Sequence, residues 1–345
     1  MPASIGRRVA LSAGFGASLG AGRAFAADAQ RVEAARREGQ VVWYTSLVVA
    51  QIVRPVAQAF ERLYGIRVTF LAAPWQETTL RLLNEGRSAT PRADIWDGAP
   101  TFYPLREAGL TGSYQPEPIG AYPRDITDPA GQWYPQILMF TCPAINTDLV
   151  RGDAVPRSYA DLLHPRWQGR MAWSDSPSAG GPPGMIGAIL TRMGEAEGMA
   201  FLRGLARQRI ANVPVNQRVV LNQCISGQYP LVLSIYNYHA SISMAQGAPV
   251  AWLKLDPTVF TFGTIGLMKA APNPNAARLF LDFVLSEAGQ RLHADAGYIP
   301  AHPAVAATNP GLKPDAGHFD TTLVSPDQFA ANEGKWIGIW RELFH

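Results

Sequence analysis

The alternation of short apolar runs with amphipathic segments between residues 41 and 98 constrains the fold more than any other feature of this sequence. Apolar runs of strand length occupy residues 41–44, 66–71 and 94–97. The two segments between them, 49–64 and 77–85, have the apolar spacing of helices. Neighbouring parallel strands need a crossover of this kind. The pattern therefore predicts a βαβαβ unit, in which helices cover a parallel sheet.

The same alternation continues through the rest of the chain. Further strands are expected at residues 133–142, 170–173, 250–255 and 260–268, with one more that begins at 228 and ends in Tyr236-Asn237-Tyr238. Helices are expected between and after them, at 185–192, 197–207, 218–225, 276–284 and 336–344. At 345 residues, with 47% hydrophobic and 17% charged residues, the chain has the length and composition of a globular protein with two lobes.

The first 26 residues have the pattern of an export signal. Arg7-Arg8 precede a weakly apolar run, and Ala24-Phe25-Ala26 fits a signal-peptidase site. Twin-arginine export and general secretion both stay open. Without Arg7, Arg8 and Arg23 the chain has 27 basic and 27 acidic residues, so we expect a mature protein with no net charge. That balance argues against nucleic acid as a partner. We predict a periplasmic protein cleaved near Ala26.

The residue types that usually form metal centres or catalytic motifs do not cluster along this sequence. Its six histidines lack metal-ligand spacing with one another or with the two cysteines. A nucleophile elbow, a phosphate loop and paired catalytic carboxylates are also absent from the sequence. We therefore expect no enzyme activity and no cofactor. Cys142 and Cys224 both lie in apolar runs of a chain expected to be exported, and a disulfide between them stays open.

Polar residues follow three of the predicted strands at the point where a helix begins. Ends of this kind carry free backbone N–H groups, which bind anions well. Plain helix capping is the alternative interpretation, because serine, threonine and asparagine cap helices widely. The candidate ligand-binding residues at these junctions are Thr45, Ser46, Ser174, Ser178 and Asn216.

Five more side chains complete the predicted site. Tyr236 and Asn237 stand at the end of a buried strand, where open α/β sheets bind ligands. Arg218 could clamp a carboxylate or phosphate, or form an ordinary surface ion pair. Trp75 and Trp173 could flank an organic ligand, although aromatic residues are often core. Asp97 could accept a hydrogen bond from a ligand, or cap a turn.

Several stretches of the mature chain, in the same order, resemble the periplasmic solute-binding proteins of ABC importers, in the two-lobed type that includes the ferric-ion binders. The stretches are Val41-Val-Trp-Tyr-Thr45, Phe60-Glu-Arg-Leu-Tyr-Gly65, Ala93-Asp-Ile-Trp-Asp97, Ala144-Ile-Asn-Thr147, Tyr159-Ala-Asp-Leu-Leu-His-Pro165, Ala276-Ala-Arg-Leu-Phe-Leu-Asp-Phe283, Glu287-Ala-Gly-Gln290 and Ile299-Pro300. The resemblance implies a type II fold of two α/β lobes joined by two crossover strands. The expected lobes are 27–133 with 258–297, and 134–257 with 298–345.

The same resemblance bears on the ligand. Ferric binders of the family place two adjacent tyrosines where this chain has Tyr236-Asn237, and Thr45-Ser46-Leu47 replaces the histidine or arginine often found after the first strand. If the segment stays extended, Tyr238 points away from Tyr236. Hard Fe(III) prefers several anionic oxygen ligands. Tyr236, Tyr238 and His239 are its candidate ligands only if iron is bound.

We therefore predict the solute-binding component of an ABC importer. It is expected to hold a small anionic organic or oxyanion solute between its lobes and to deliver it, as a monomer, to an inner-membrane permease. Carboxylate, phosphate, phosphonate and sulfonate solutes all stay open. A ferric-ion binder is the alternative within the class, and a two-lobed enzyme or the ligand module of a sensor is the alternative outside it.

Overall fold

The structure, a computed structural model, describes residues 29–88 and 90–345, so the predicted signal peptide lies outside the described residues. The strands are β1 (Gln40–Thr45), β2 (Arg67–Ala72), β3 (Ile95–Asp97), β4 (Tyr134–Asn146), β5 (Met171–Ser174), β6 (Ala211–Val213), β7 (Leu231–Tyr236), β8 (Val250–Trp252), β9 (Thr258–Leu267), β10 (Ile299–Pro300) and β11 (Thr321–Leu323). After a helix at 29–38, the α-helices are α2 (Arg54–Tyr64), α3 (Trp75–Gly86), α4 (Ala99–Glu107), α5 (Pro182–Met193), α6 (Glu195–Ala206), α7 (Gln217–Ile225), α8 (Asn237–Ala245), α9 (Pro274–Leu285), α10 (Glu287–Asp295), α11 (Pro314–Gly317) and α12 (Pro326–Phe344).

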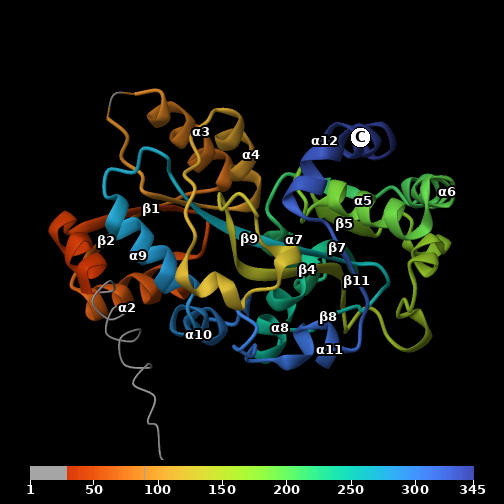
Figure 1. The fold of residues 1–345 in the computed structure, drawn as a ribbon. Helices are drawn as coiled ribbons and strands as arrows, with labels where there is room; N and C mark the ends of the chain where they lie inside the picture. The colour runs from red at the N-terminus through yellow and green to blue at the C-terminus, as the bar shows by residue number, and fades with distance from the viewer. Residues whose placement is uncertain (1–28, 89) are drawn as a thin grey trace, which may run out of the picture.

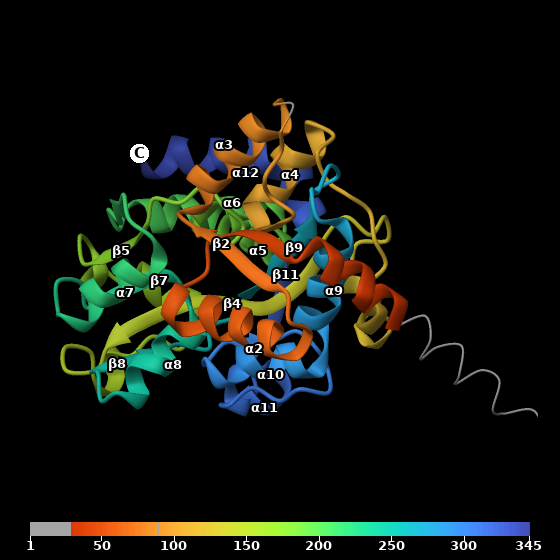
Figure 2. The same ribbon diagram turned by 90° about the vertical axis from the view of Figure 1, so that its left-hand side faces the viewer.

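The first lobe is the predicted parallel unit. Strand β1 lies between β2 and β3 and is parallel to both. Because neighbouring side chains of a strand point to opposite faces, Trp43 packs in a core with Phe60 of α2 and Phe280 of α9, whereas Tyr44 joins a separate cluster that contains Phe102 of α4. Figure 2 shows α3 and α4 on one side of β1 and β2, with α2 on the other. The predicted βαβαβ arrangement is confirmed.

Two long antiparallel strands connect this lobe to the second one. Strand β9 pairs with β3 and with β4, and β4 continues to β7, which gives the sheet order β2-β1-β3-β9-β4-β7-β5-β6. Strands β7, β5 and β6 are again parallel. Figure 1 shows β4 and β9 running between two groups of helices. The predicted type II architecture is confirmed: each lobe has a mostly parallel part of the sheet, and the crossover strands β4 and β9 join the two parts.

Each lobe has its own hydrophobic core. Trp173, Ile186 and Trp336 belong to the core of the second lobe. Tyr298 and Leu312 pack into the core around β1, although the predicted boundaries place residues 298–345 in the second lobe. We keep those boundaries as a proposal. Within the described ranges, no helix combines the length and the apolar composition needed to cross a membrane.

Four predicted elements differ from the observed ones. Helix α2 is preceded by a wider, π-helical turn at Val49–Val53, because Pro55 has no N–H to continue the regular ladder. Strand β8 ends at Trp252 rather than at residue 255. Helix α12 begins ten residues earlier than predicted, with the Ser325 side chain accepting a hydrogen bond from the N–H of Gln328. The segment after Tyr236 is helical rather than extended.

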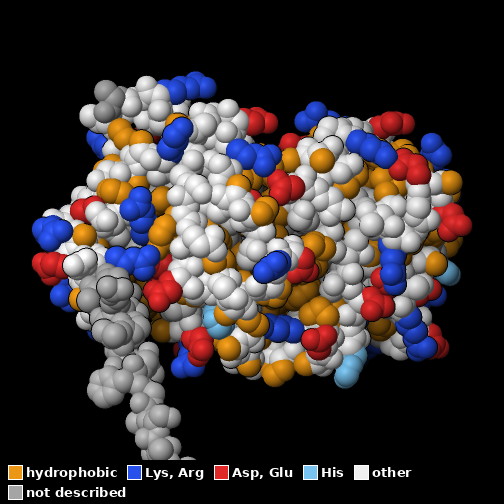
Figure 3. All heavy atoms as spheres, viewed as in Figure 1, with side chains coloured by type: hydrophobic (Ala, Val, Ile, Leu, Met, Phe, Trp, Pro, Cys, Tyr) orange, Lys and Arg blue, Asp and Glu red, His pale blue; other side chains and the backbone are white. Residues whose placement is uncertain are grey.

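The face drawn in Figure 3 carries charges of both signs, with Lys and Arg side chains interspersed among Asp and Glu side chains. Cys142 on β4 and Cys224 on α7 are buried free thiols, so the structure contains no disulfide between them. Burial raises the pKa of the Cys224 thiol to about 12, which keeps it protonated and unreactive.

Candidate functional site

The first half of the site lies where β1 and β3 end. One oxygen of Asp97, Oδ1, accepts from the Ser46 N–H at 2.9 Å and from the Ser46 hydroxyl at 3.1 Å, and the other, Oδ2, accepts from Trp43 Nε1 at 3.0 Å. Asp97 is 1% exposed, and burial raises its pKa to about 6, against the opposing effect of these hydrogen bonds and of Thr45. The geometry therefore makes Asp97 the group that positions Ser46, with both of its oxygens engaged.

Trp75 lies next to this cluster. It is the first residue of α3 and is half-buried. A Cβ added at Gly98 would lie 3.4 Å from the Ser46 hydroxyl and 3.9 Å from Trp75 Cβ, so these three residues are neighbours. The structure thus brings together four of the predicted residues from the first lobe: Thr45, Ser46, Trp75 and Asp97.

The second half of the site is the loop between β5 and α5. The hydroxyls of Ser176 and Ser178 lie 3.1 Å apart. The backbone N–H groups of Ala179 and Gly180 have no hydrogen-bond acceptor among the described residues, although both residues are buried. Helix α5 follows directly, with Pro182 in its first turn. Free N–H groups and hydroxyls at a helix N-terminus form an arrangement suited to an anion.

The Tyr236 side chain packs against this loop at Gly180. A Cβ added at Gly180 would lie 2.3 Å from the Tyr236 hydroxyl, so only glycine leaves room for the phenol. That hydroxyl has no hydrogen-bond partner in the described part of the chain. Burial raises the pKa of Tyr236 to about 12, which keeps the phenol neutral and able to donate. The Gln217 side-chain amide donates to the Gly180 carbonyl at 3.2 Å and holds the loop in place.

The prediction that Tyr238 points away from Tyr236 is wrong. Because α8 begins at Asn237, the two rings lie on the same side and stack with centroids 5.6 Å apart and planes 5° from parallel. Tyr238 also contacts His239, whose pKa burial lowers to about 3, so that imidazole is neutral. Asn237 is fully buried and donates to the Leu312 carbonyl at 3.0 Å, while its side-chain oxygen has no partner among the described residues.

The structure gives other predicted residues positions that differ from expectation. Trp173 is 0% exposed, donates to Asn212 at 2.6 Å and packs edge-on against Phe344, so it is a core residue rather than one that flanks a ligand. Ser174 is buried and its hydroxyl donates to the Val215 carbonyl. Asn216 is exposed and caps α7 by accepting from the N–H of Val219. Capping, the alternative interpretation, therefore describes what Asn216 does here.

Arg218 uses only one of its guanidinium nitrogens in a hydrogen bond with another described residue. Its Nη1 donates to the His239 carbonyl at 3.0 Å. Nε and Nη2 make no hydrogen bond to any residue in the described ranges. The side chain is half-buried, and His239, to which it donates, packs against the rings of Tyr236 and Tyr238. It therefore keeps donors with which it could contact an anion, while its first hydrogen bond fixes its position.

Sequence reasoning missed Tyr298. Its ring lies 5.1 Å from that of Tyr238. Burial raises the pKa of Tyr298 to about 12, and the nearby Val48 N–H opposes that rise. In the sequence, the stretch Gly297-Tyr298-Ile-Pro300 is recognisable only as the end of a helix. The free N–H groups of Ala179 and Gly180 were also unrecognised individually, since backbone donors leave no mark on a side-chain pattern.

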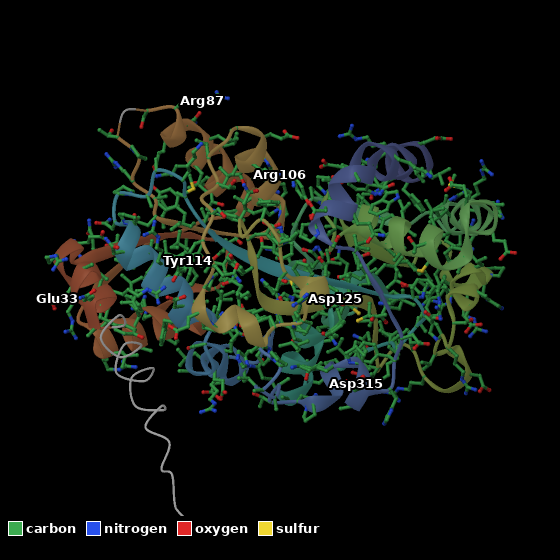
Figure 4. The ribbon with its side chains drawn as sticks, in the orientation of Figure 1. Glu33, Arg87, Arg106, Tyr114, Asp125 and Asp315 are labelled. Carbon is green, nitrogen blue, oxygen red and sulfur yellow. The ribbon has the colours of Figure 1, made fainter. Side chains whose placement is uncertain are left out.

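Two further hollows lie outside this region. One, of about 690 Å³, is on the first lobe and includes Tyr114, Arg278 and Asp282 in its lining; Figure 4 labels Tyr114. The other, of about 460 Å³, lies beside β2. Neither hollow is lined by a predicted ligand residue. The candidate site is therefore defined by the unpaired hydrogen-bond donors described above. Within the described ranges, no group of three or more His, Cys, Asp or Glu residues is placed to hold a metal ion.

Known proteins resemble this chain over most of its length. The Fe(3+)-binding periplasmic protein of Serratia marcescens is 24% identical over 275 residues, which cover 76% of this chain and 79% of the relative. Among solved structures, the periplasmic binding protein P5PA superposes with a TM-score of 0.76 at 21% identity, covering 89% of this chain and 100% of its own. AfuA from Actinobacillus pleuropneumoniae, described with exogenous fructose-6-phosphate bound, gives 0.73 at 20% identity, with 89% and 98% covered.

The match to a family model decides the identity of the chain. Residues 98–322 fit the model of the bacterial extracellular solute-binding protein family. This span is well over half of the sequence, and the solved structures support the same two-lobed fold. The resemblance drawn from short stretches of sequence is therefore confirmed: the chain belongs to the bacterial extracellular solute-binding proteins and has their type II periplasmic-binding fold.

Proposed function

We propose that this protein binds a small anionic solute at the loop between β5 and α5. The observation that carries the proposal is the set of free donors there, namely the buried N–H groups of Ala179 and Gly180 with the Tyr236 hydroxyl beside them. Ser178 adds a hydroxyl, and the free guanidinium donors of Arg218 add positive charge. Buried donors without acceptors are uncommon in folded proteins, because each one costs free energy unless a partner satisfies it. An anion supplies that partner.

The first lobe would contact the rest of the solute. Ser46 is held in place by Asp97, and Trp75 offers a half-exposed indole face next to it. A hydroxyl and an aromatic face suit the organic part of a carboxylate or phosphate ester better than a bare inorganic ion. The AfuA structure, described with fructose-6-phosphate bound, makes a sugar phosphate the first solute to test.

The cellular role follows from the family. The relatives are periplasmic binding proteins, which are transport components. We propose that the mature chain acts in the periplasm as a monomer without catalytic activity or a resident cofactor. Binding of the solute would favour the closed arrangement of the lobes, and a permease of an ABC importer would recognise that arrangement.

Calorimetric titration of the mature, metal-stripped protein tests the anion. The probes are inorganic phosphate, fructose 6-phosphate, citrate and a neutral sugar. We expect an anion to bind and Tyr236→Phe to weaken it about 10- to 100-fold, because a hydrogen bond to a charged group is lost. Tyr229→Phe is the matched control, since Tyr229 is half-buried outside the site. Binding of the neutral sugar alone, or equal effects of both variants, would refute the proposal.

Fe(III) is the second candidate solute. It is favoured by the Tyr236–Tyr238 stack and by the Serratia marcescens relative named as an Fe(3+)-binding protein. Burial raises the pKa of both phenols, which opposes the tyrosinate form that iron needs. Adding ferric citrate to the stripped protein tests this candidate. A visible tyrosinate–iron absorption band that is lost in Tyr236→Phe would identify Fe(III), rather than an organic anion, as the solute.

A further inference from the structure

Tyr298 occupies a position that touches both halves of the site. Its backbone leads from α10 into β10, which pairs with the crossover strand β4 through Ile299 and Leu138. The Tyr298 N–H donates to the His293 carbonyl at 2.9 Å, and the side chain is only 3% exposed. A Cβ added at the preceding Gly297 would lie 3.0 Å from Ile242 of α8. In Figure 1, α10 lies between α2 of the first lobe and α8 of the second.

Its side chain makes one contact in each direction. Towards the first lobe, Tyr298 packs in the same hydrophobic cluster as Ile52 and Val53, and its hydroxyl faces the N–H of Val48, the residue at which the turn after Ser46 becomes helical. Two residues before Tyr298, the Ala296 carbonyl accepts a hydrogen bond from the Gln51 side-chain amide at 2.6 Å. Towards the second lobe, the ring packs on Tyr238 at a tilt of 48°, and Tyr238 stacks in turn on Tyr236. The three aromatic rings therefore form a continuous row from Val48 to Gly180, which we call the tyrosine row.

We infer that Tyr298 is a positioning residue that couples the strand–helix junction at Ser46 to the anion-binding loop at Gly180. The inference deepens the proposed function and rests on it for the role of that loop. Rings stacked in close contact cannot shift independently, since packed interiors resist small displacements. A displacement of Tyr236 by a bound solute would therefore be passed through Tyr238 to Tyr298 and to the start of the helix at Val49.

The hydroxyl and the ring of Tyr298 make separable contributions. Tyr298→Phe keeps the row and removes only the hydroxyl that faces the Val48 N–H. Tyr298→Leu removes both. Amide hydrogen exchange of the unliganded protein, followed by mass spectrometry, reads the two effects at residues 45–53, 174–181 and 236–245. Tyr122→Phe is the matched control, because it removes a buried tyrosine hydroxyl that donates to the Leu285 carbonyl, away from the row.

We expect Tyr298→Phe to accelerate exchange about tenfold at residues 45–53 alone, because the polar contact between the hydroxyl and the Val48 N–H is lost. Tyr298→Leu should accelerate exchange in all three segments. Unchanged exchange at 174–181 and 236–245 in Tyr298→Leu, or the same change in Tyr122→Phe, would overturn the inference. If Tyr298→Leu does not fold, Tyr238→Leu breaks the row from the other side and should accelerate exchange at 45–53.

A binding measurement separates this inference from the proposed function. If fructose 6-phosphate binds the wild type, Tyr298→Leu should weaken it at least about tenfold and Tyr298→Phe less than about threefold. Equal affinities in the wild type and Tyr298→Leu would contradict the coupling. If neither phosphate nor fructose 6-phosphate binds the wild type, the phosphate form of the proposed function fails, while the exchange experiment still decides the role of Tyr298.

Discussion

Replacing Gly180 by alanine tests the contact on which the proposed anion-binding loop depends. The added Cβ would lie 2.3 Å from the Tyr236 hydroxyl and 3.0 Å from two ring carbons. The phenol cannot swing away freely, because its ring is stacked on Tyr238. Forcing an extra carbon into such a contact costs about 1–3 kcal/mol. We expect Gly180→Ala to lower the melting temperature by a few degrees and to abolish anion binding.

A double-mutant cycle gives this prediction its control. Tyr236→Phe removes the oxygen that is 2.3 Å from the added carbon, so Gly180→Ala should cost less in that background. Gly181→Ala is the matched comparison, since its Cβ would meet the Ser176 carbonyl oxygen at 2.1 Å and Tyr236→Phe cannot relieve a backbone clash. Thermal and urea unfolding of the two glycine variants, of Tyr236→Phe and of the two double variants measure the cost of each added carbon with and without the hydroxyl. Equal costs of Gly180→Ala with and without the hydroxyl would refute the reasoning.

Three further predictions concern stability and the rest of the site. Burial raises the pKa of Asp97 to about 6, so its contribution to stability is fully present below about pH 4 and is lost as the pH rises through 6. In urea unfolding, the wild type should lose up to about 3 kcal/mol of unfolding free energy relative to Asp97→Asn between pH 4 and pH 7. A difference between the two proteins that does not change with pH would contradict the prediction. Trp173→Phe should lower the free energy of unfolding by about 1–3 kcal/mol without changing the affinity for the solute. Trp75→Ala should weaken solute binding with little loss of stability. Thermal unfolding measures the stability of both variants, and calorimetry measures their affinity. Asp327→Asn breaks the 3.1 Å ion pair with Arg106, labelled in Figure 4, between α12 and α4, and should change stability by less than about 1 kcal/mol because both side chains are exposed.

The parallel order of the first lobe could be predicted because it depends on local pattern alone. The apolar run of β1 and the helical spacing of apolar residues in α2 are visible in the sequence, and they predict a strand followed by a helix that packs on the sheet. The positions of Thr45, Ser46 and Ser178 at strand-to-helix junctions could be predicted for the same reason, because each stands at or shortly after the end of a strand. Asn216 shows the limit of that reasoning, because a cap and a ligand contact use the same residue type.

The errors occur where tertiary contacts decide the outcome. Trp173 is the last residue but one of β5, and its burial depends on Asn212 and on Phe344 near the C-terminus. Tyr238 was placed on the wrong side because the start of a helix at Asn237 has no capping signal in the sequence. Tyr298 lies 60 residues after Tyr238, so their contact appears only when β10 pairs with β4.

The protonation state of the phenols in the tyrosine row bears on which solute can bind beside them. Tyr236 lies against free N–H groups that would hold an anion, and burial already keeps its phenol protonated. A negative charge beside a phenol raises its pKa further, so an anion and a neutral donor stabilise each other. To bind Fe(III), the two stacked phenols would have to lose their protons, although burial raises the pKa of both and Tyr238 is buried. His239, held neutral by burial and by the Arg218 guanidinium, adds no charge that would assist the metal. The row therefore consists of neutral phenols and packed rings, which supports the proposed organic anion over Fe(III).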